Sequence, residues 1–216
     1  MKIFIIRQSA VLPSDENNPK EWREVILYRW AKRLSSTVKI ICSSFDHYSL
    51  KQRRKPYFSD DVITLSTFGY RKTISVLRVL DSWFFSLKLF FFTLHNVSGE
   101  DKILISMPTP ESVFAVSLAK KFKGFNLIVD VRDNWPDALP DNSLKAPFSK
   151  YVNLLNRFTF KSANIITFMS QGLLNNYTKK SLIPDHSKVE FLPLIYKKIL
   201  ILARKKYMTT IAFSKS

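Results

Sequence analysis

Short β-branched segments alternate with longer helical patterns along most of the chain. The β-branched segments fall at residues 2–7, 37–42, 62–66, 102–106, 126–131, 164–168 and 188–192. Helical patterns lie near residues 19–35, 73–97, 110–123, 146–161 and 170–178. Strands that alternate with helices are typical of parallel βαβ units, because each helix carries the chain back to the starting edge of the sheet. The sequence therefore predicts an α/β fold with a doubly wound, mostly parallel sheet.

The first expected helix has a start signal in residues 18–21, which read Asn-Pro-Lys-Glu. Asparagine is a favourable N-cap, proline suits the first helical position, and glutamate stands at the third. The apolar stripe that we expect to face the sheet consists of Trp22, Ile26, Trp30 and Leu34.

Residues 127–137 pass from an apolar strand into a polar, aromatic loop that contains a proline. Ligand sites of doubly wound sheets lie at the carboxyl ends of the strands, so the polar residues of this segment are expected on the rim of a crevice. They are Asp130, Arg132, Asp133, Trp135 and Asp137. An arginine fork suits a phosphate or carboxylate, and a carboxylate can accept a hydroxyl proton. The structural alternative is that Asp130 and Asp133 cap the turn while Arg132 pairs with one of them.

The chain of 216 residues carries a net charge of +17, spread over both halves. Such a field attracts anionic membranes, phosphorylated substrates and nucleic acids. No zinc-finger, helix-turn-helix or RNA-binding signature is present, so we favour a membrane surface or a phosphorylated substrate over DNA or RNA. His47, His95 and His186 have no histidine or cysteine neighbours at ligand spacing, and no metal site is predicted. The chain begins with a strand and not with a signal peptide, which predicts a cytoplasmic protein.

Residues 74–97 form the most apolar segment, yet Arg78, Asp81 and Lys88 interrupt it. Its longest uncharged run is too short to span a bilayer, which takes about 20 apolar residues. The pattern instead predicts an amphipathic helix whose apolar stripe packs on the sheet. That stripe consists of Val76, Leu80, Trp83, Leu87, Phe90 and Leu94.

Three further apolar side chains of the same helix, Phe85, Leu89 and Phe92, fall outside this stripe. With the stripe on the sheet they would be exposed, which predicts an edge that dips into a membrane or contacts a partner. The alternative is that neighbouring loops cover them.

Several segments resemble, in order, the N-terminal half of a family 4 glycosyltransferase. They are residues 1–7, 103–110, 127–137, 163–170 and 188–194. Enzymes of that family are retaining and have two Rossmann-like domains that face a cleft, the GT-B architecture. The most specific block, residues 132–136, is similar to the Arg-Asp-x-Trp-Pro motif of members that act in bacterial capsule, O-antigen or exopolysaccharide assembly. The resemblance covers residues 1–194 and implies a single N-terminal GT-B domain.

The resemblance implies that this domain binds the acceptor, a lipid-linked sugar or a polysaccharide, at the inner face of the plasma membrane. It places Arg132, Asp133, Trp135 and Asp137 on the acceptor side of the cleft. Ser106, Pro108 and Thr109 would line the same crevice from the neighbouring strand end, and Ser170 would lie at the tip of the next strand. No resident cofactor is implied, and the nucleotide sugar would be a co-substrate held by a donor domain. No catalytic residue is carried over, since other members have a histidine where Arg132 stands.

The chain departs from the family in two places. Residues 8–18 contain no glycine, whereas many members have a Gly-Gly loop there. The donor domain should follow residue 194, where this chain has only the basic segment 195–216. That segment reads either as a basic amphipathic tail on a membrane or as what remains after truncation of the second domain.

These departures leave it open whether the chain is itself an enzyme. The leading hypothesis is the acceptor-binding half of a glycosyltransferase, which binds acceptor but turns over poorly alone. The second is a non-catalytic, membrane-attached subunit of a split enzyme whose partner polypeptide supplies the donor domain. The third, motivated by charge alone, is a nucleic-acid or polyanion binder.

Overall fold

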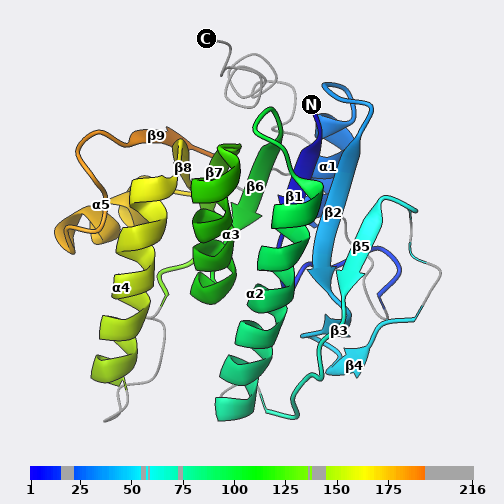
Figure 1. Ribbon diagram of the computed structural model, residues 1–216. Coiled ribbons are helices and arrows are strands. Elements are labelled where there is room, and N and C mark those ends of the chain that lie inside the picture. The colour runs from blue at the N-terminus through cyan, green and yellow to red at the C-terminus, as the bar shows by residue number, and fades with distance from the viewer. Residues whose placement is uncertain are drawn as a thin grey trace.

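The computed structural model describes residues 1–15, 22–54, 57, 59–72, 75–135, 137 and 145–192. In these ranges seven parallel strands form one sheet in the order β5-β2-β1-β6-β7-β8-β9 (Figure 1). The strands are β1 (Ile3–Ile6), β2 (Val38–Ser43), β5 (Val62–Leu65), β6 (Lys102–Ser106), β7 (Asn126–Val131), β8 (Ile165–Phe168) and β9 (Lys188–Phe191). The expected α/β fold with a doubly wound parallel sheet is confirmed, and every expected strand is present.

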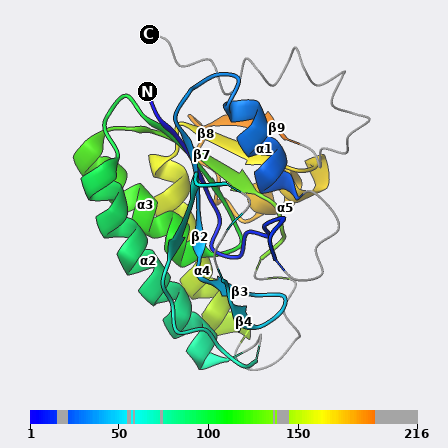
Figure 2. The ribbon, with the colours of Figure 1, turned by 90° about the vertical axis from the view of Figure 1, so that its right-hand side faces the viewer.

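Helices cover both faces of the sheet. The helices α2 (Val76–Asn96), α3 (Pro110–Lys123) and α4 (Lys145–Ser162) lie side by side on one face, and α1 (Arg23–Ala31) lies on the other (Figures 1 and 2). The helix α5 (Gln171–Lys179) connects β8 to β9. A short antiparallel pair, β3 (Phe45–Asp46) and β4 (Lys51–Gln52), was not predicted, because two-residue strands leave no periodic pattern.

The strands are apolar because the sheet is buried on both faces. In β1, Phe4 and Ile6 join the core beneath α2 and α3, while Ile3 and Ile5 pack against α1. Two hydrophobic cores on opposite faces thus fix the register of the central strands, since a shift of one residue would exchange the two faces.

The inward face of α1 matches the predicted stripe only in part. Trp30 is buried, and Ile26 and Leu34 pack partly buried against the same core. Trp22 is only half-buried, and the charged residues Arg23 and Glu24 also face the interior. Their buried ion pairs, described below, decide the rotation of the helix. The predicted start signal in residues 18–21 lies outside the described residues.

The helix α2 is rotated relative to the prediction, so the expected membrane edge is wrong. Phe85 and Leu89 are 0% exposed and belong to the core, and Phe92 packs partly buried against it. The predicted inward stripe faces outward at Val76, Leu80 and Leu87, whereas its last two members, Phe90 and Leu94, pack against the core. Polar residues are accommodated on the inner face because each is hydrogen-bonded there. Asp81 accepts from the Gly69 amide, and the Ser86 hydroxyl donates to the Ser82 carbonyl.

None of the described helices is long and apolar enough to cross a membrane. The predicted basic tail, residues 195–216, and Pro136 of the Arg-Asp-x-Trp-Pro block lie outside the described residues. The predicted boundary at residue 194 therefore stays a prediction.

Candidate functional site

The carboxyl ends of the parallel strands meet at one edge of the sheet, and a buried ion network underlies that edge. Arg7 follows β1, Glu24 belongs to α1, and Arg132 follows β7. The Glu24 carboxylate is 0% exposed and accepts from Arg7 at 2.8 Å and also from Arg132. Burial alone would raise the pKa of Glu24, but the two guanidinium groups together hold it below its usual value. One buried carboxylate thus joins three separate elements.

A second buried carboxylate, Asp130 at the end of β7, forms the other half of the network. Arg23 donates to it from Nε at 3.1 Å and from Nη2 at 2.9 Å, while Ser106 and Thr167 donate from the neighbouring strands. Asp130 is 0% exposed, and Ser106, whose hydroxyl donates to it, is 1% exposed. The expectation that these two side chains lie on the rim of a crevice is therefore wrong. Asp130 holds α1 against the sheet through Arg23, and Ser106 supports the Asp130 carboxylate.

The alternative in which Arg132 pairs with Asp130 or Asp133 is also wrong. Arg132 pairs with Glu24 and not with Asp130 or Asp133, because α1 supplies an acidic and a basic side chain side by side. Asp133 is exposed at the surface.

A small hollow lies at the same carboxyl edge of the sheet. Its wall includes residues at the ends of β1, β2 and β6, in the loops after β3 and β5, and in the N-terminal part of α2. They are Gln8, Ser43, His47, Tyr70, Arg78, Asp81, Pro108 and Thr109. Pro108 and Thr109 therefore lie in the hollow, where the sequence placed a crevice. Thr109 precedes α3, and its side chain makes no capping hydrogen bond with that fully described helix.

Two hydrogen-bonded groups form the inner wall of the hollow. Tyr70 and His47 share a hydrogen bond between the hydroxyl and Nδ1. Burial raises the pKa of Tyr70 to about 12, so its hydroxyl stays protonated and can donate to the imidazole. Asp81 accepts from the Gly69 amide at 2.7 Å and from Gln8 Nε2 at 3.5 Å. Burial raises the pKa of Asp81 above its usual value.

Gly69 is required at this wall by both conformation and space. Its φ of +76° lies in the left-handed region, and a Cβ would lie 2.4 Å from the Phe45 ring. The resulting close approach lets the Gly69 amide reach Asp81.

Arg78 connects the hollow with the Trp135 loop. Its guanidinium carbon lies 6.0 Å from the centre of the Tyr70 ring and 5.9 Å from that of Trp135. The Trp135 ring also packs edge-on against Phe148 of α4, with centroids 5.9 Å apart. Arg78 therefore lies near both Tyr70 in the wall of the hollow and Trp135 in the neighbouring loop.

The other predicted residues make structural contacts. The Ser170 hydroxyl caps α5 by accepting from the Leu173 amide. Tyr177 of α5 donates to the carbonyl oxygens of Asp133 and Trp135, so α5 supports the tryptophan loop. Asp137 pairs with Lys180 at 2.6 Å.

Of the wall residues named above, six were not predicted as site residues from the sequence: Gln8, Ser43, His47, Tyr70, Arg78 and Asp81. The sequence does single out Asp81, because a lone carboxylate in an apolar helix lies either in solvent or in a hydrogen-bonded site. His47 and Tyr70 lie near the unpredicted pair of strands, and nothing in the sequence indicates that they meet. Among the described residues, no group of three histidine, cysteine or acidic side chains could hold a metal ion.

His47 gives the site a testable pH dependence. Burial, and then Arg78, lowers the pKa of its imidazole. An unfolded histidine takes up a proton near pH 6.5, whereas folded His47 does so only at lower pH. Between these values the unfolded chain binds more protons, so the free energy of unfolding falls as the pH drops below about 6.5.

Replacement His47→Gln should therefore reduce the loss of stability between pH 7.5 and pH 5.5. Urea unfolding of both proteins at the two pH values measures this difference. An equal loss in the two proteins would show that His47 has an ordinary pKa in the folded state.

Comparison with solved structures identifies proteins of similar fold. A structure of sucrose-phosphate synthase from Thermosynechococcus elongatus matches with a TM-score of 0.61 at 10% identity, over 99% of this chain and 100% of that one. α,α-Trehalose 6-phosphate synthase from Burkholderia multivorans matches with a TM-score of 0.50 at 8% identity. That match covers 98% of this chain and 53% of the synthase.

The chain shares the fold of the sucrose-phosphate synthase structure and of about half of the trehalose 6-phosphate synthase. Both are glycosyltransferases of the GT-B architecture, so the Rossmann-like sheet described here is the one found in GT-B enzymes. No family model and no curated protein matches the chain. Identities of 8% and 10% relate the folds alone, and the site must carry the functional argument.

Proposed function

We propose that the chain is the acceptor-binding part of a glycosyltransferase of family 4 type that acts in cell-surface polysaccharide synthesis. The observation that carries the proposal is the convergence of Thr109, the His47–Tyr70 pair, Asp81 and Arg78 around one hollow at the carboxyl edge of the sheet. Open α/β sheets bind their ligands at that edge. The likeness of the fold to two sugar-transferring synthases supports the same reading.

The chemistry of the wall suits a sugar that carries a phosphate. The half-buried Trp135 ring offers an aromatic face for the apolar face of a sugar ring, while the buried Tyr70 ring belongs to the wall. A few placed polar groups then fix the orientation of the sugar. Asp81, Gln8 and Thr109 offer oxygen and amide groups to sugar hydroxyls. Arg78 lies between the two rings and supplies positive charge for a phosphate. A lipid-linked sugar diphosphate or a polysaccharide acceptor is the substrate class that we propose.

Sugar transfer also requires a nucleotide sugar as co-substrate. We assign its binding to a donor domain, on the same or a separate polypeptide, and to none of the residues described here. The role of this chain in the reaction is then to hold the acceptor hydroxyl in position. Positioning accelerates the transfer because it converts a bimolecular step into an effectively unimolecular one.

Titration with a hexose phosphate, followed by saturation-transfer NMR, tests the proposal. We expect saturable binding that replacement Arg78→Met weakens at least about tenfold, because a hydrogen bond to a charged group is lost. Lys88→Met is the matched control, since Lys88 belongs to the same helix but lies outside the hollow and binds Ser66.

Two results would contradict the proposal. One is equal weakening by both substitutions, which would indicate attraction by overall charge. The other is inorganic phosphate that binds as tightly as the hexose phosphate, which would make the hollow an anion site without a sugar subsite.

A further inference from the structure

The outer surface of α2 is an apolar stripe that faces solvent. Its seven members have exposed fractions between 37% and 77%. They are Val76, Leu77, Leu80, Trp83, Phe84, Leu87 and Phe91. At 100° per residue they occupy one arc, opposite the buried residues Phe85, Leu89 and Thr93. We call these seven residues the α2 stripe. Contiguous exposed apolar surface of this kind marks a contact with a partner or a membrane.

The exposed charges of α2, α3 and α4 have a single sign. The helices α2, α3 and α4, all fully described, lie side by side on one face of the sheet (Figure 1). Their basic residues are Arg78, Lys88, Lys120, Lys121, Lys123, Lys145, Lys150, Arg157 and Lys161. Their acidic residues are Asp81 and Glu111, which are 1% and 4% exposed and so lie in the interior. The exposed charge of these three helices is therefore entirely positive.

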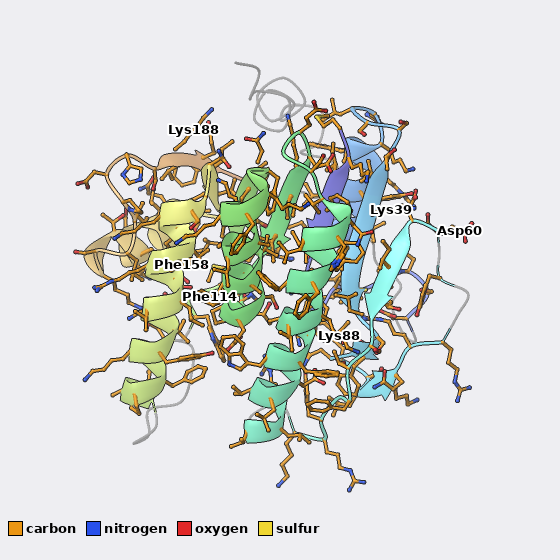
Figure 3. The ribbon with its side chains drawn as sticks, viewed as in Figure 1. Lys39, Asp60, Lys88, Phe114, Phe158 and Lys188 are labelled. Carbon is orange, nitrogen blue, oxygen red and sulfur yellow. The ribbon has the colours of Figure 1, made fainter. Side chains whose placement is uncertain are left out.

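Apolar and basic groups are interleaved on this face. Lys88 lies 4.4 Å from the centre of the Phe84 ring, and Lys121 lies 4.4 Å from that of Phe158. Figure 3 shows Phe158 with Phe114 on the α3–α4 side of the face and Lys88 on the α2 side. Phe122 at the end of α3 is 70% exposed, and Leu154 of α4 is 68% exposed.

We propose that the α2–α3–α4 face docks on an anionic lipid bilayer, with the α2 stripe inserted among the headgroups. An interfacial helix combines Trp, Phe and Leu on one side with lysine and arginine beside them, which is the combination found here. Basic side chains near the surface are attracted to anionic lipids. A second copy of the chain is a poor occupant, since pairing two such faces would bring charges of one sign together. Nucleic acid would engage the cations but leave the apolar stripe in water.

The docking face and the hollow share a helix. Arg78 and Asp81 of α2 line the hollow, between two and nine residues along the helix from Trp83 and Leu87 in the stripe. A bilayer in contact with the stripe would therefore lie beside the hollow. If the proposed function holds, this arrangement suits an acceptor sugar carried on a membrane lipid. The membrane contact itself does not depend on the proposed function.

Vesicle flotation of the full chain tests the docking face. At physiological ionic strength we expect binding to phosphatidylcholine vesicles that contain about a third phosphatidylglycerol, and at least about tenfold weaker binding to phosphatidylcholine alone. The double substitution Leu80→Ser with Leu87→Ser should weaken binding to the anionic vesicles at least about tenfold, because it removes apolar side chains from the stripe. Both leucines are more than half exposed, so the fold does not need them.

A matched pair of charge variants separates this face from the overall charge. Lys121→Glu with Arg157→Glu changes exposed cations of α3 and α4, whereas Arg29→Glu with Arg33→Glu makes the same change of charge on the α1 side. We expect the first pair to weaken vesicle binding at least about tenfold and the second to leave it within about twofold.

Three outcomes would overturn the docking proposal: no binding to anionic vesicles, equal loss in the two charge variants, or unchanged binding of the leucine variant. Self-association that the leucine variant abolishes, without vesicle binding, would assign the stripe to a second copy. Hexose phosphate binding in the hollow is measured without lipid. The acceptor-site proposal and the docking proposal can therefore fail independently of each other.

Discussion

Replacement of Glu24 by glutamine is expected to lower the free energy of unfolding by about 3–5 kcal/mol. The Glu24 carboxylate is fully buried and accepts from both Arg7 and Arg132. Glutamine keeps the size of the side chain but removes its charge, so two nearly buried guanidinium groups lose their counter-ion. Chemical denaturation followed by circular dichroism measures the change.

The control for this prediction is Asp137→Asn. Asp137 also forms an ion pair, with Lys180 at 2.6 Å, but about a third of each side chain is exposed. Exposed pairs contribute about 1 kcal/mol or less, so this variant should unfold close to the wild type. Equal losses in the two variants would mean that the network beneath the carboxyl edge does not hold α1 to the sheet.

Replacement Phe85→Ala is expected to cost about 3–5 kcal/mol of stability, because it opens a cavity in the core beneath α2. Phe85 is 0% exposed, whereas Phe91, on the same helix, is 50% exposed. Phe91→Ala should therefore cost about 1 kcal/mol or less. The same denaturation experiment compares the two variants.

This pair of phenylalanines tests the rotation of α2 directly. With the predicted apolar stripe on the sheet, Phe85 would be exposed and its replacement nearly harmless. A large loss for Phe91→Ala and a small one for Phe85→Ala would restore that orientation and remove the basis of the docking face.

The sheet was predictable because its strands are buried on both faces. Segments such as Ile3–Ile6 and Asn126–Val131 are short apolar runs with helical patterns between them, and only parallel crossovers fit that order. The predicted strand ends also located Pro108 and Thr109 at the carboxyl edge, where the hollow lies.

The orientation of α2 was not predictable from its apolar pattern. Packing of α2 against α3 and the sheet favours small polar residues whose hydroxyls bond within the helix, as Ser86 and Thr93 do. The inner face therefore mixes these hydroxyls with Phe85 and Leu89, while other large apolar side chains such as Phe91 are left outside. A helical wheel identifies a stripe but not the surface that covers it.

The ion network was equally hidden in the sequence. Glu24 and Arg132 are 108 residues apart, and only the completed fold brings them together. The sequence therefore placed Arg132 and Asp130 on the ligand surface, because a charged residue at a strand end has the same appearance whether it binds a ligand or another element.

The most direct test of the central claim maps where a sugar binds. Amide chemical shifts of the ¹⁵N-labelled chain, recorded during titration with a hexose phosphate, should change at Gln8, Ser43, Tyr70 and Thr109, which line the hollow. Shifts at Thr37 and Phe125, before β2 and β7 at the opposite edge, should stay constant. Changes confined to that opposite edge, or no changes at saturating sugar, would contradict the assignment of the hollow as an acceptor site.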